Sequence, residues 1–83
     1  MPSSRAPTVR QRRLGVALRR LRENSGLSTD LVGRRLSWSA SKVSRIETAR
    51  IGVRESDVKR MLKLYKAADH ASNELLALAR EAA

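Results

Sequence analysis

The chain has 83 residues, of which 18 are Lys or Arg and 8 are Asp or Glu, so its formal net charge is +10. This length suits one small domain. Cysteine is absent, which excludes disulfide scaffolds, thiolate zinc sites and cysteine nucleophiles. No apolar stretch approaches the roughly 20 residues that span a bilayer, and the basic amino terminus lacks the apolar segment of a secretory signal. We therefore expect a soluble, cytoplasmic protein.

The positive charge is concentrated in the first two thirds of the chain. Residues 1–54 contain 13 cationic and three acidic side chains, whereas residues 55–83 contain five of each. A GC-rich genome would also favour arginine, but codon bias does not confine the surplus to one end. The pattern therefore indicates a polyanionic partner. With one Trp, one Tyr and no Phe, the chain lacks aromatic platforms for single-stranded bases, so a duplex is the better candidate.

The first expected helix follows a short arm. Residues 1–7 show no period and predict a mobile basic arm. Thr8 and Gln11 have the spacing of a capping box. Apolar residues then recur at helical spacing, which predicts a helix over Val9 to Ser25 that ends at Gly26. Six arginines of this helix lie off its apolar stripe.

Two short helices come next. Ser28 is an N-cap candidate for a helix from Thr29 to about Leu36, and Ser39 for a helix through about Thr48. The turn between them is too tight for antiparallel packing, and the small Gly33 permits close helix approach. Residues 28–48 therefore predict a helix-turn-helix motif.

The rest of the chain also predicts helices. The loop after the third helix is expected to turn on Gly52. A fourth helix is expected at about residues 55–67, and a fifth at about 71–82, capped by Asp69 or Ser72. Because no segment alternates like a strand, the sequence predicts an all-α, compact five-helix bundle. The leucines of the fifth helix either complete this core or form a homodimer contact.

The outward face of the third helix carries the side chains that we expect to bind DNA. We expect Val43 and Ile46 of this helix to be buried in the core. Ser41 and Arg45 then point away from the core, and Lys42 and Ser44 flank them. An arginine there can reach O6 and N7 of a guanine. A merely solvated face is the alternative, but these outward positions contain no acid.

Other polar groups suit the DNA backbone. The N–H groups at the two helix starts capped by Ser28 and Ser39 can bind phosphate oxygens, and we expect first-helix arginines against phosphates. Trp38 either donates its indole N–H to a phosphate or covers the junction between the second and third helices. The lone His70 has no second ligand nearby. We expect no enzymatic activity, metal or cofactor, because no nucleophile–base pair, ligand cluster or Gly-rich phosphate loop is present.

These segments resemble the Cro/C1-type (XRE-like) helix-turn-helix of phage repressors and bacterial regulators, which has the lambda-repressor-like fold. The resemblance covers about residues 9–67. Its most specific part is the run Ser-Ala-Ser-Lys-Val-Ser-Arg-Ile-Glu at 39–47. The chain is most similar to the actinobacterial branch, whose members usually carry a further C-terminal domain and are often encoded beside a small partner protein. The resemblance thus implies the N-terminal DNA-binding domain of a longer transcriptional regulator.

The family pattern also implies roles for single residues. Base contacts are expected from Ala40, Ser41, Lys42, Ser44 and Arg45. The pattern places Ser28, Thr29 and Ser39 at phosphates and Arg22 near the DNA backbone. Apart from the pattern, we also expect phosphate contacts from Arg19 and Arg50. Glu47 is expected to form a partly buried ion pair with Arg22 rather than remain a surface acid, since an unpaired carboxylate would repel phosphate.

Two positions depart from the family pattern. Ser37 stands where the turn usually has Gly, so it must adopt a left-handed conformation or shift the turn. Ala49 stands where Gly usually follows the recognition helix, which leaves the path of Arg50 open.

The sequence therefore favours a sequence-specific, double-stranded DNA-binding transcriptional regulator with the helix Ser39 to Thr48 in the major groove. The alternative is an interaction module in which residues 55–83 bind a small protein that modulates DNA binding. Action on anionic membranes is disfavoured, because the arginines do not line one polar face opposite a continuous apolar one.

Overall fold

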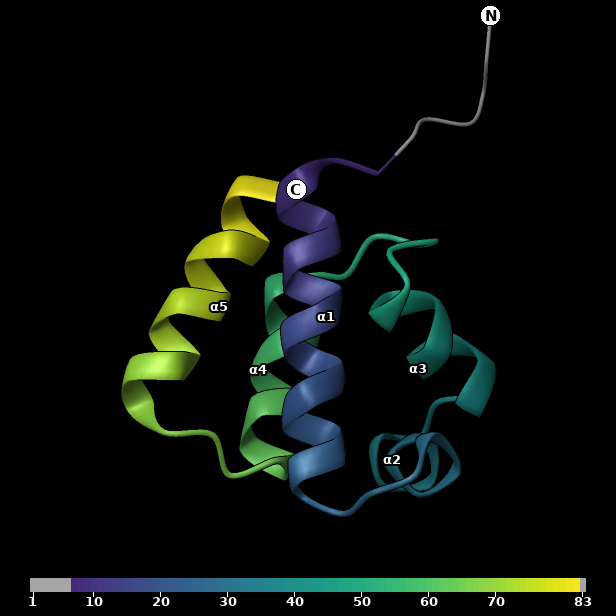
Figure 1. Cartoon of the computed structure of the whole chain (residues 1–83). Helices are drawn as coiled ribbons and strands as arrows, with labels where there is room; N and C mark the ends of the chain where they lie inside the picture. Colours follow the sequence, from purple (N-terminus) through teal and green to yellow (C-terminus); the bar gives the residue numbers. More distant parts are fainter. Residues whose placement is uncertain (1–6, 83) are drawn as a thin grey trace, which may run out of the picture.

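The computed structural model describes residues 7–82 and consists of five helices. They are α1 (Val9–Asn24), α2 (Thr29–Leu36), α3 (Ala40–Glu47), α4 (Glu55–Leu64) and α5 (Asp69–Ala82) (Figure 1). The described range contains no strand, so the predicted all-α five-helix bundle is confirmed. Within the same range, no helix has the length and hydropathy of a membrane span. Residues 1–6 of the predicted arm lie outside the description.

The starts of the first three helices are fixed by local hydrogen bonds. The N–H of Gln11 donates to Thr8 Oγ1 at 3.1 Å and the N–H of Thr8 donates to Gln11 Oε1 at 2.9 Å, which completes the predicted capping box. Ser28 and Ser39 each accept the backbone N–H three residues further on, at 3.1 and 3.0 Å. Both predicted N-caps are therefore confirmed.

The ends of α1 to α4 share one backbone motif. A residue in the left-handed region follows each helix, and the next N–H donates to the carbonyl five residues earlier, at 2.7 to 3.2 Å. The left-handed residues are Gly26, Ser37, Ala49 and Lys66, with φ of 72°, 61°, 58° and 55°. Ser37 thus keeps the turn geometry that usually requires Gly. The prediction that the next loop turns on Gly52 was wrong, because the left-handed residue in that loop is Ala49.

The boundaries of the last two helices differ from the prediction. The α-helical part of α4 ends at Leu64 rather than near residue 67, because the left-handed Lys66 turns the chain. The next helix begins at Asp69, so the prediction of a cap from Asp69 or Ser72 was wrong. The N–H of Ser72 donates to the carbonyl of Ala68 at 2.9 Å, which makes Ala68 the residue before the first turn.

One hydrophobic core joins all five helices. Its largest fully buried side chains are Leu18, Met61, Val32, Val43 and Val58, which come from α1 to α4. Leu75 and Ala79 add α5 to the same core, while Leu76 and Leu78 are half-buried against it. The leucines of α5 therefore mostly complete this core.

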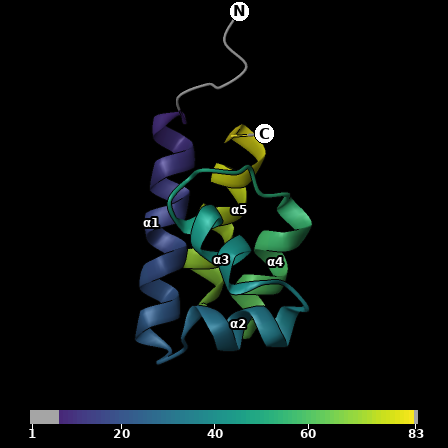
Figure 2. The ribbon, with the colours of Figure 1, turned by 90° about the vertical axis from the view of Figure 1, so that its right-hand side faces the viewer.

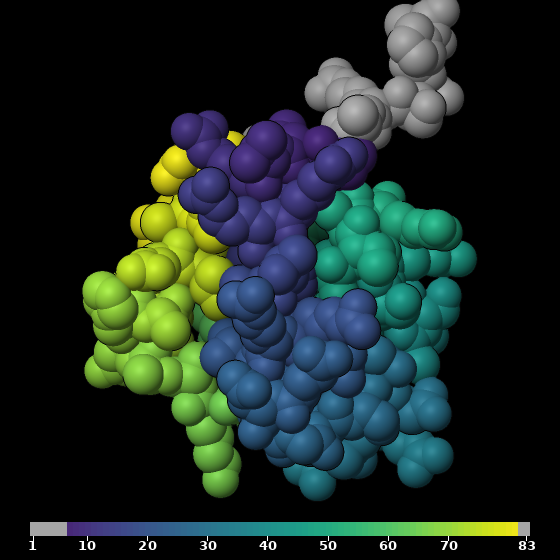
Figure 3. Space-filling view, in the orientation of Figure 1, coloured from purple at the N-terminus to yellow at the C-terminus, as the bar shows by residue number. Residues whose placement is uncertain are grey.

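The helices place α3 and α5 on opposite sides of α1. In Figure 1, α1 runs down the centre with α5 on one side, α3 on the other and α4 behind. Figure 2 shows α2 crossing one end of the bundle, next to α3. In the space-filling view, α1 covers the front between α5 and the α2–α3 pair (Figure 3). Among the described residues, no Cα atom of α3 lies within 8 Å of one in α5.

Two glycines allow this arrangement. A Cβ at Gly15 would overlap the carbonyl oxygen of Glu47 and lie 2.9 Å from that of Ile46, so α1 and α3 approach each other closely there. A Cβ at Gly33 would lie 2.6 Å from the carbonyl oxygen of Trp38, which agrees with the close approach predicted at this residue. The role of Gly15 was not predicted, because a single glycine in a helical pattern gives no sign of what packs against it.

Candidate nucleic-acid interface

The outer face of α3 is polar and slightly hollowed. Its inner side is fixed by Val43 and Ile46, which are 0% and 2% exposed. The exposed side contributes to a shallow concavity lined by Ser41, Ser44, Arg45, Thr48 and Arg50. Three of the five predicted base-contact residues thus meet at one surface, together with one predicted phosphate contact.

Thr48 belongs to this surface although the sequence analysis gave it no binding role. It is the C-cap of α3, and its hydroxyl donates to the carbonyl of Ser44 at 2.9 Å. The available signal was spacing, since residues four apart on a helix share a face. The left-handed Ala49 then turns the chain back, and the N–H of Arg50 donates to the carbonyl of Arg45 at 2.8 Å. This turn brings Arg50 beside α3.

The other two predicted base-contact residues lie elsewhere. Ala40 is half-buried in the first turn of α3 and does not line the concavity. Lys42 is directed toward α4, where its ammonium lies 3.8 Å from the carboxylate of Asp57 and 4.2 Å from the ring centroid of Trp38. Base contact by Lys42 would require it to leave both partners.

Trp38 packs at the junction of α2, α3 and α4. It is half-buried against the core, with Lys42 over its ring and the guanidinium carbon of Arg60 5.3 Å from the ring centroid. Arg60 also donates to the carbonyl of Leu36 at 2.8 Å. Of the two roles considered for Trp38, the structure supports covering the junction.

Arg22 and Glu47 form the ion pair implied by the family pattern. Arg22 Nε donates to Glu47 Oε2 at 2.7 Å, Nη2 donates to Oε1 at 3.1 Å, and Nη1 donates to the carbonyl of Leu27 at 2.8 Å. The two side chains are only 12% and 4% exposed. The hydrogen bonds to Glu47 raise the pKa of Arg22, against the opposing effect of burial, so the guanidinium stays charged.

This pair changes the role expected for Arg22. Its guanidinium ties α1 to the end of α3 and to the loop before α2, and little of it reaches solvent. Arg22 is therefore placed to hold α3 rather than to serve as a free phosphate ligand.

The remaining predicted phosphate contacts are at the surface or close to it. Ser28 and Ser39 are exposed at the starts of α2 and α3, and Thr29 is half-buried in the first turn of α2. Arg19 is exposed and pairs with Glu23 at 3.2 Å. Such an exposed pair is weak, so a phosphate can replace the carboxylate.

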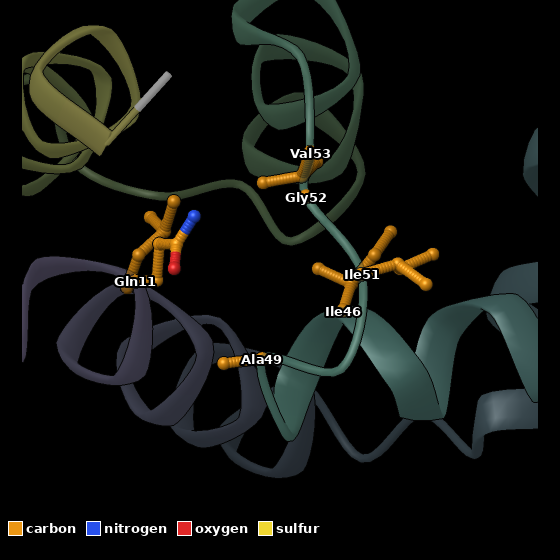
Figure 4. Close-up of a pocket in the computed structure, with 7 residues that line it drawn as sticks. Gln11, Ile46, Ala49, Ile51, Gly52 and Val53 are labelled. Carbon is orange, nitrogen blue, oxygen red and sulfur yellow. The ribbon is translucent and has the colours of Figure 1, made fainter. Parts of the chain in front are cut away.

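The loop that carries Arg50 stands slightly away from α1. Between them is a cavity of about 50 Å³, lined in part by Gln11, Leu14, Ile46 and Ala49 (Figure 4). Ile51 in this loop is 38% exposed. The surface beside the concavity therefore rests on a loosely packed segment.

The fold and this surface together define a helix-turn-helix domain, with α2 and α3 as the motif. The family model described as "Helix-turn-helix domain" matches residues 13–82. This match covers most of the chain, so the chain belongs to that family, whose fold is a DNA-binding one. Comparison with curated proteins and with solved structures found no match. The Cro/C1-type and actinobacterial assignments stay predictions.

Proposed function

We propose that the protein binds double-stranded DNA in a sequence-dependent manner and regulates transcription, with α3 in the major groove. The observation that carries this proposal is the concavity on α3, which combines two arginines and three hydroxyls with no acid. The major groove is wide enough for a helix, and its floor presents acceptors to such donors. A bacterial regulator of this kind would act in the cytoplasm, where the DNA is.

Arg45 is the main candidate for base recognition. It is exposed in the last turn of α3, and its fork of N–H donors matches O6 and N7 of a guanine. Ser41 and Ser44 lie on the same face and are short enough to let the backbone of α3 approach the bases. Ala40 can contact a thymine methyl from the first turn. The ion pair and stacking of Lys42 make it a lesser candidate.

Phosphate contacts would orient α3 from both sides. The N-termini of α2 and α3, capped by Ser28 and Ser39, present N–H groups to phosphate oxygens, with Thr29 in the first turn of α2. Arg50 and Arg19 add positive charge. Roughly 5 to 8 such contacts per domain would supply most of the affinity through counterion release.

Selection from a random duplex library tests the proposal. We expect Arg45→Ala to lose the preference at one base pair and to weaken binding to the best site by about 1 to 3 kcal/mol. Arg80→Ala is the matched control, because it removes the same charge from α5, whose Cα atoms all lie more than 8 Å from those of α3. An unchanged preference in the Arg45 variant would remove this residue from base recognition, and an unselective wild-type chain would contradict the function itself.

The same selection distinguishes the alternatives. A homodimer would select palindromic half-sites about 34 Å apart, whereas a monomer selects one site.

The alternative that α4 and α5 bind a small partner protein has less support, because Leu75 and Ala79 of α5 are already buried in the core.

A further inference from the structure

A second hollow lies where α1 and α5 meet. In Figure 1, α5 is on the side of α1 away from α3. The apolar side chains of this groove are Val16, Ala17, Leu21, Ala71 and Leu75. Val16 is 52% exposed, although it lies in the middle of a helix. The groove is therefore a largely apolar surface in which Val16 is exposed, while Leu75 at its floor already belongs to the core.

The α1 edge of the groove carries two arginines without acidic partners. Arg13 and Arg20 line it and are seven residues apart, which is about 10.5 Å along the helix axis. Neither forms an ion pair within residues 7–82. Of the other arginines of this helix, Arg10, Arg19 and Arg22 form ion pairs, and Arg12, which does not line the groove, forms none within the same range. On the opposite edge, Glu74 already lies 2.9 Å from His70.

The groove and the proposed DNA surface are on different sides of α1. Arg22 points at α3, where it pairs with Glu47. At 100° per residue, Arg13 and Arg20 project from the opposite side of the helix. A duplex bound along α3 would therefore leave these two arginines and the groove exposed.

The charges of the groove indicate its occupant. Two copies packed through it would bring four arginines together against two glutamates, which disfavours a second copy. An anionic duplex could pair with the arginines but would not bury the apolar floor of the groove. A helix with an apolar ridge and two acidic residues seven apart could do both. Its ridge would cover the apolar floor, and its carboxylates would repeat at the spacing of Arg13 and Arg20. We propose that this groove binds an acidic amphipathic helix of another protein.

The test uses the 83-residue chain and a fluorescent synthetic helical peptide of Leu, Ala and Gln with Glu at two ridge-flanking positions seven apart. The control peptide has Lys at the same two positions. Fluorescence anisotropy should show roughly tenfold tighter binding of the Glu peptide, because two ion pairs are gained and two repulsions avoided. Binding of the Glu peptide should persist on a chain already saturated with duplex.

Matched double variants locate the site. Arg13→Glu with Arg20→Glu should reverse the preference, so that the Lys peptide binds more tightly than the Glu peptide. Arg12→Glu with Arg19→Glu makes the same change in net charge on the same helix and should keep the original preference. The reversal is a gain of binding, so a misfolded variant cannot imitate it.

Other results would overturn the proposal. Equal effects of the two double variants would show non-specific charge attraction, and displacement of the peptide by duplex would show that the groove is part of the DNA surface. Self-association that the Arg13 and Arg20 variant abolishes would assign the groove to a second copy, and no peptide binding at about 1 mM would leave it without an occupant. The measurement without duplex is independent of the proposed function, so DNA binding can fail while this inference stands.

Discussion

Ser37, Ala49 and Lys66 end their helices in a backbone conformation that crowds a Cβ against the following carbonyl oxygen. Only Gly26, at the end of α1, avoids this cost. The motif forms in spite of the strain because each left-handed residue lets two backbone N–H groups pair with helix carbonyls that otherwise lack partners. Local strain is thus accepted at three helix ends in exchange for satisfied hydrogen bonds.

Replacing Lys66 by Gly should stabilise the protein. We expect Lys66→Gly to raise the free energy of unfolding by about 0.5 kcal/mol, since relief of the backbone strain exceeds the added freedom of the unfolded chain. Urea unfolding measures this change. Gly26→Ala is the reciprocal control and should lower stability, and a loss of stability in both variants would contradict the strain at Lys66.

The buried Tyr65 makes stability depend on alkaline pH. Its hydroxyl has no hydrogen-bond partner among the described residues. Burial, aided by the carboxylate of Glu47, raises the pKa of Tyr65 from near 10 to about 12. The folded state therefore keeps this proton longer than the unfolded state, so stability present below pH 10 is lost as the pH rises toward 12.

Tyr65→Phe should remove that dependence. We expect the wild type to lose about 2 kcal/mol relative to the variant between pH 10 and 12, because the other titrating groups are common to both chains. At pH 7 the variant should be at least as stable, since no hydroxyl is left without a partner. If the free energies of unfolding of the wild type and the variant changed equally between pH 10 and 12, the pKa of Tyr65 would not be raised in the folded state.

At the scale of elements, α1 supports α3, the helix that we propose to bind the major groove. Gly15 lets the two helices touch through their backbones at Ile46 and Glu47, and about two turns further along α1 Arg22 pairs with the side chain of Glu47. The outer face of α3 is presented by a helix only eight residues long, which is too short to be stable alone. Its position in any complex therefore depends on this contact.

Gly15→Ala should separate α1 from α3. The added methyl would meet backbone atoms of Ile46 and Glu47, which cannot rotate away, so we expect a loss of about 2 kcal/mol in unfolding free energy. Gly52→Ala is the matched control: a Cβ there meets nothing within 4 Å, so its stability should change little. Equal effects of the two substitutions would argue against a close α1–α3 contact.

At the scale of the whole molecule, the excess positive charge belongs to α1, α2, α3 and the loop after α3. Residues 55–83, which contain the last two helices, carry as many acids as bases. Several of these acids are paired with bases of the other helices or of α4 and α5 themselves, as in Arg10–Glu81, Lys42–Asp57 and Arg80–Glu55. The charge asymmetry of the sequence thus becomes an asymmetry of the bundle.

Binding to duplex DNA should accordingly be sensitive to salt. With roughly 5 to 8 phosphate contacts, we expect a slope of about −4.5 to −7 in the logarithm of the binding constant against that of salt concentration. Arg50→Ala should reduce the slope by about 1 without a new base preference, whereas Arg80→Ala should not change it. Loss of binding to a single sequence in the Arg50 variant would mean that this arginine contacts a base.

The local features of the protein follow from the sequence by itself. The capping box of Thr8 and Gln11 and the caps of Ser28 and Ser39 were predicted because each joins residues three apart. The inward positions of Val43 and Ile46 follow from helical periodicity for the same reason. These patterns depend only on residues three or four apart in sequence, so they form however the helices pack against one another.

The tertiary structure decided what lies between helices. The place of Lys42 beside Trp38 and Asp57, the burial of Arg22 and the close contact at Gly15 all depend on how α1, α3 and α4 pack. The groove between α1 and α5 likewise exists only because two segments about 55 residues apart in sequence meet. Contacts over such separations are set by the whole core rather than by local spacing, so no short pattern in the sequence could have predicted them.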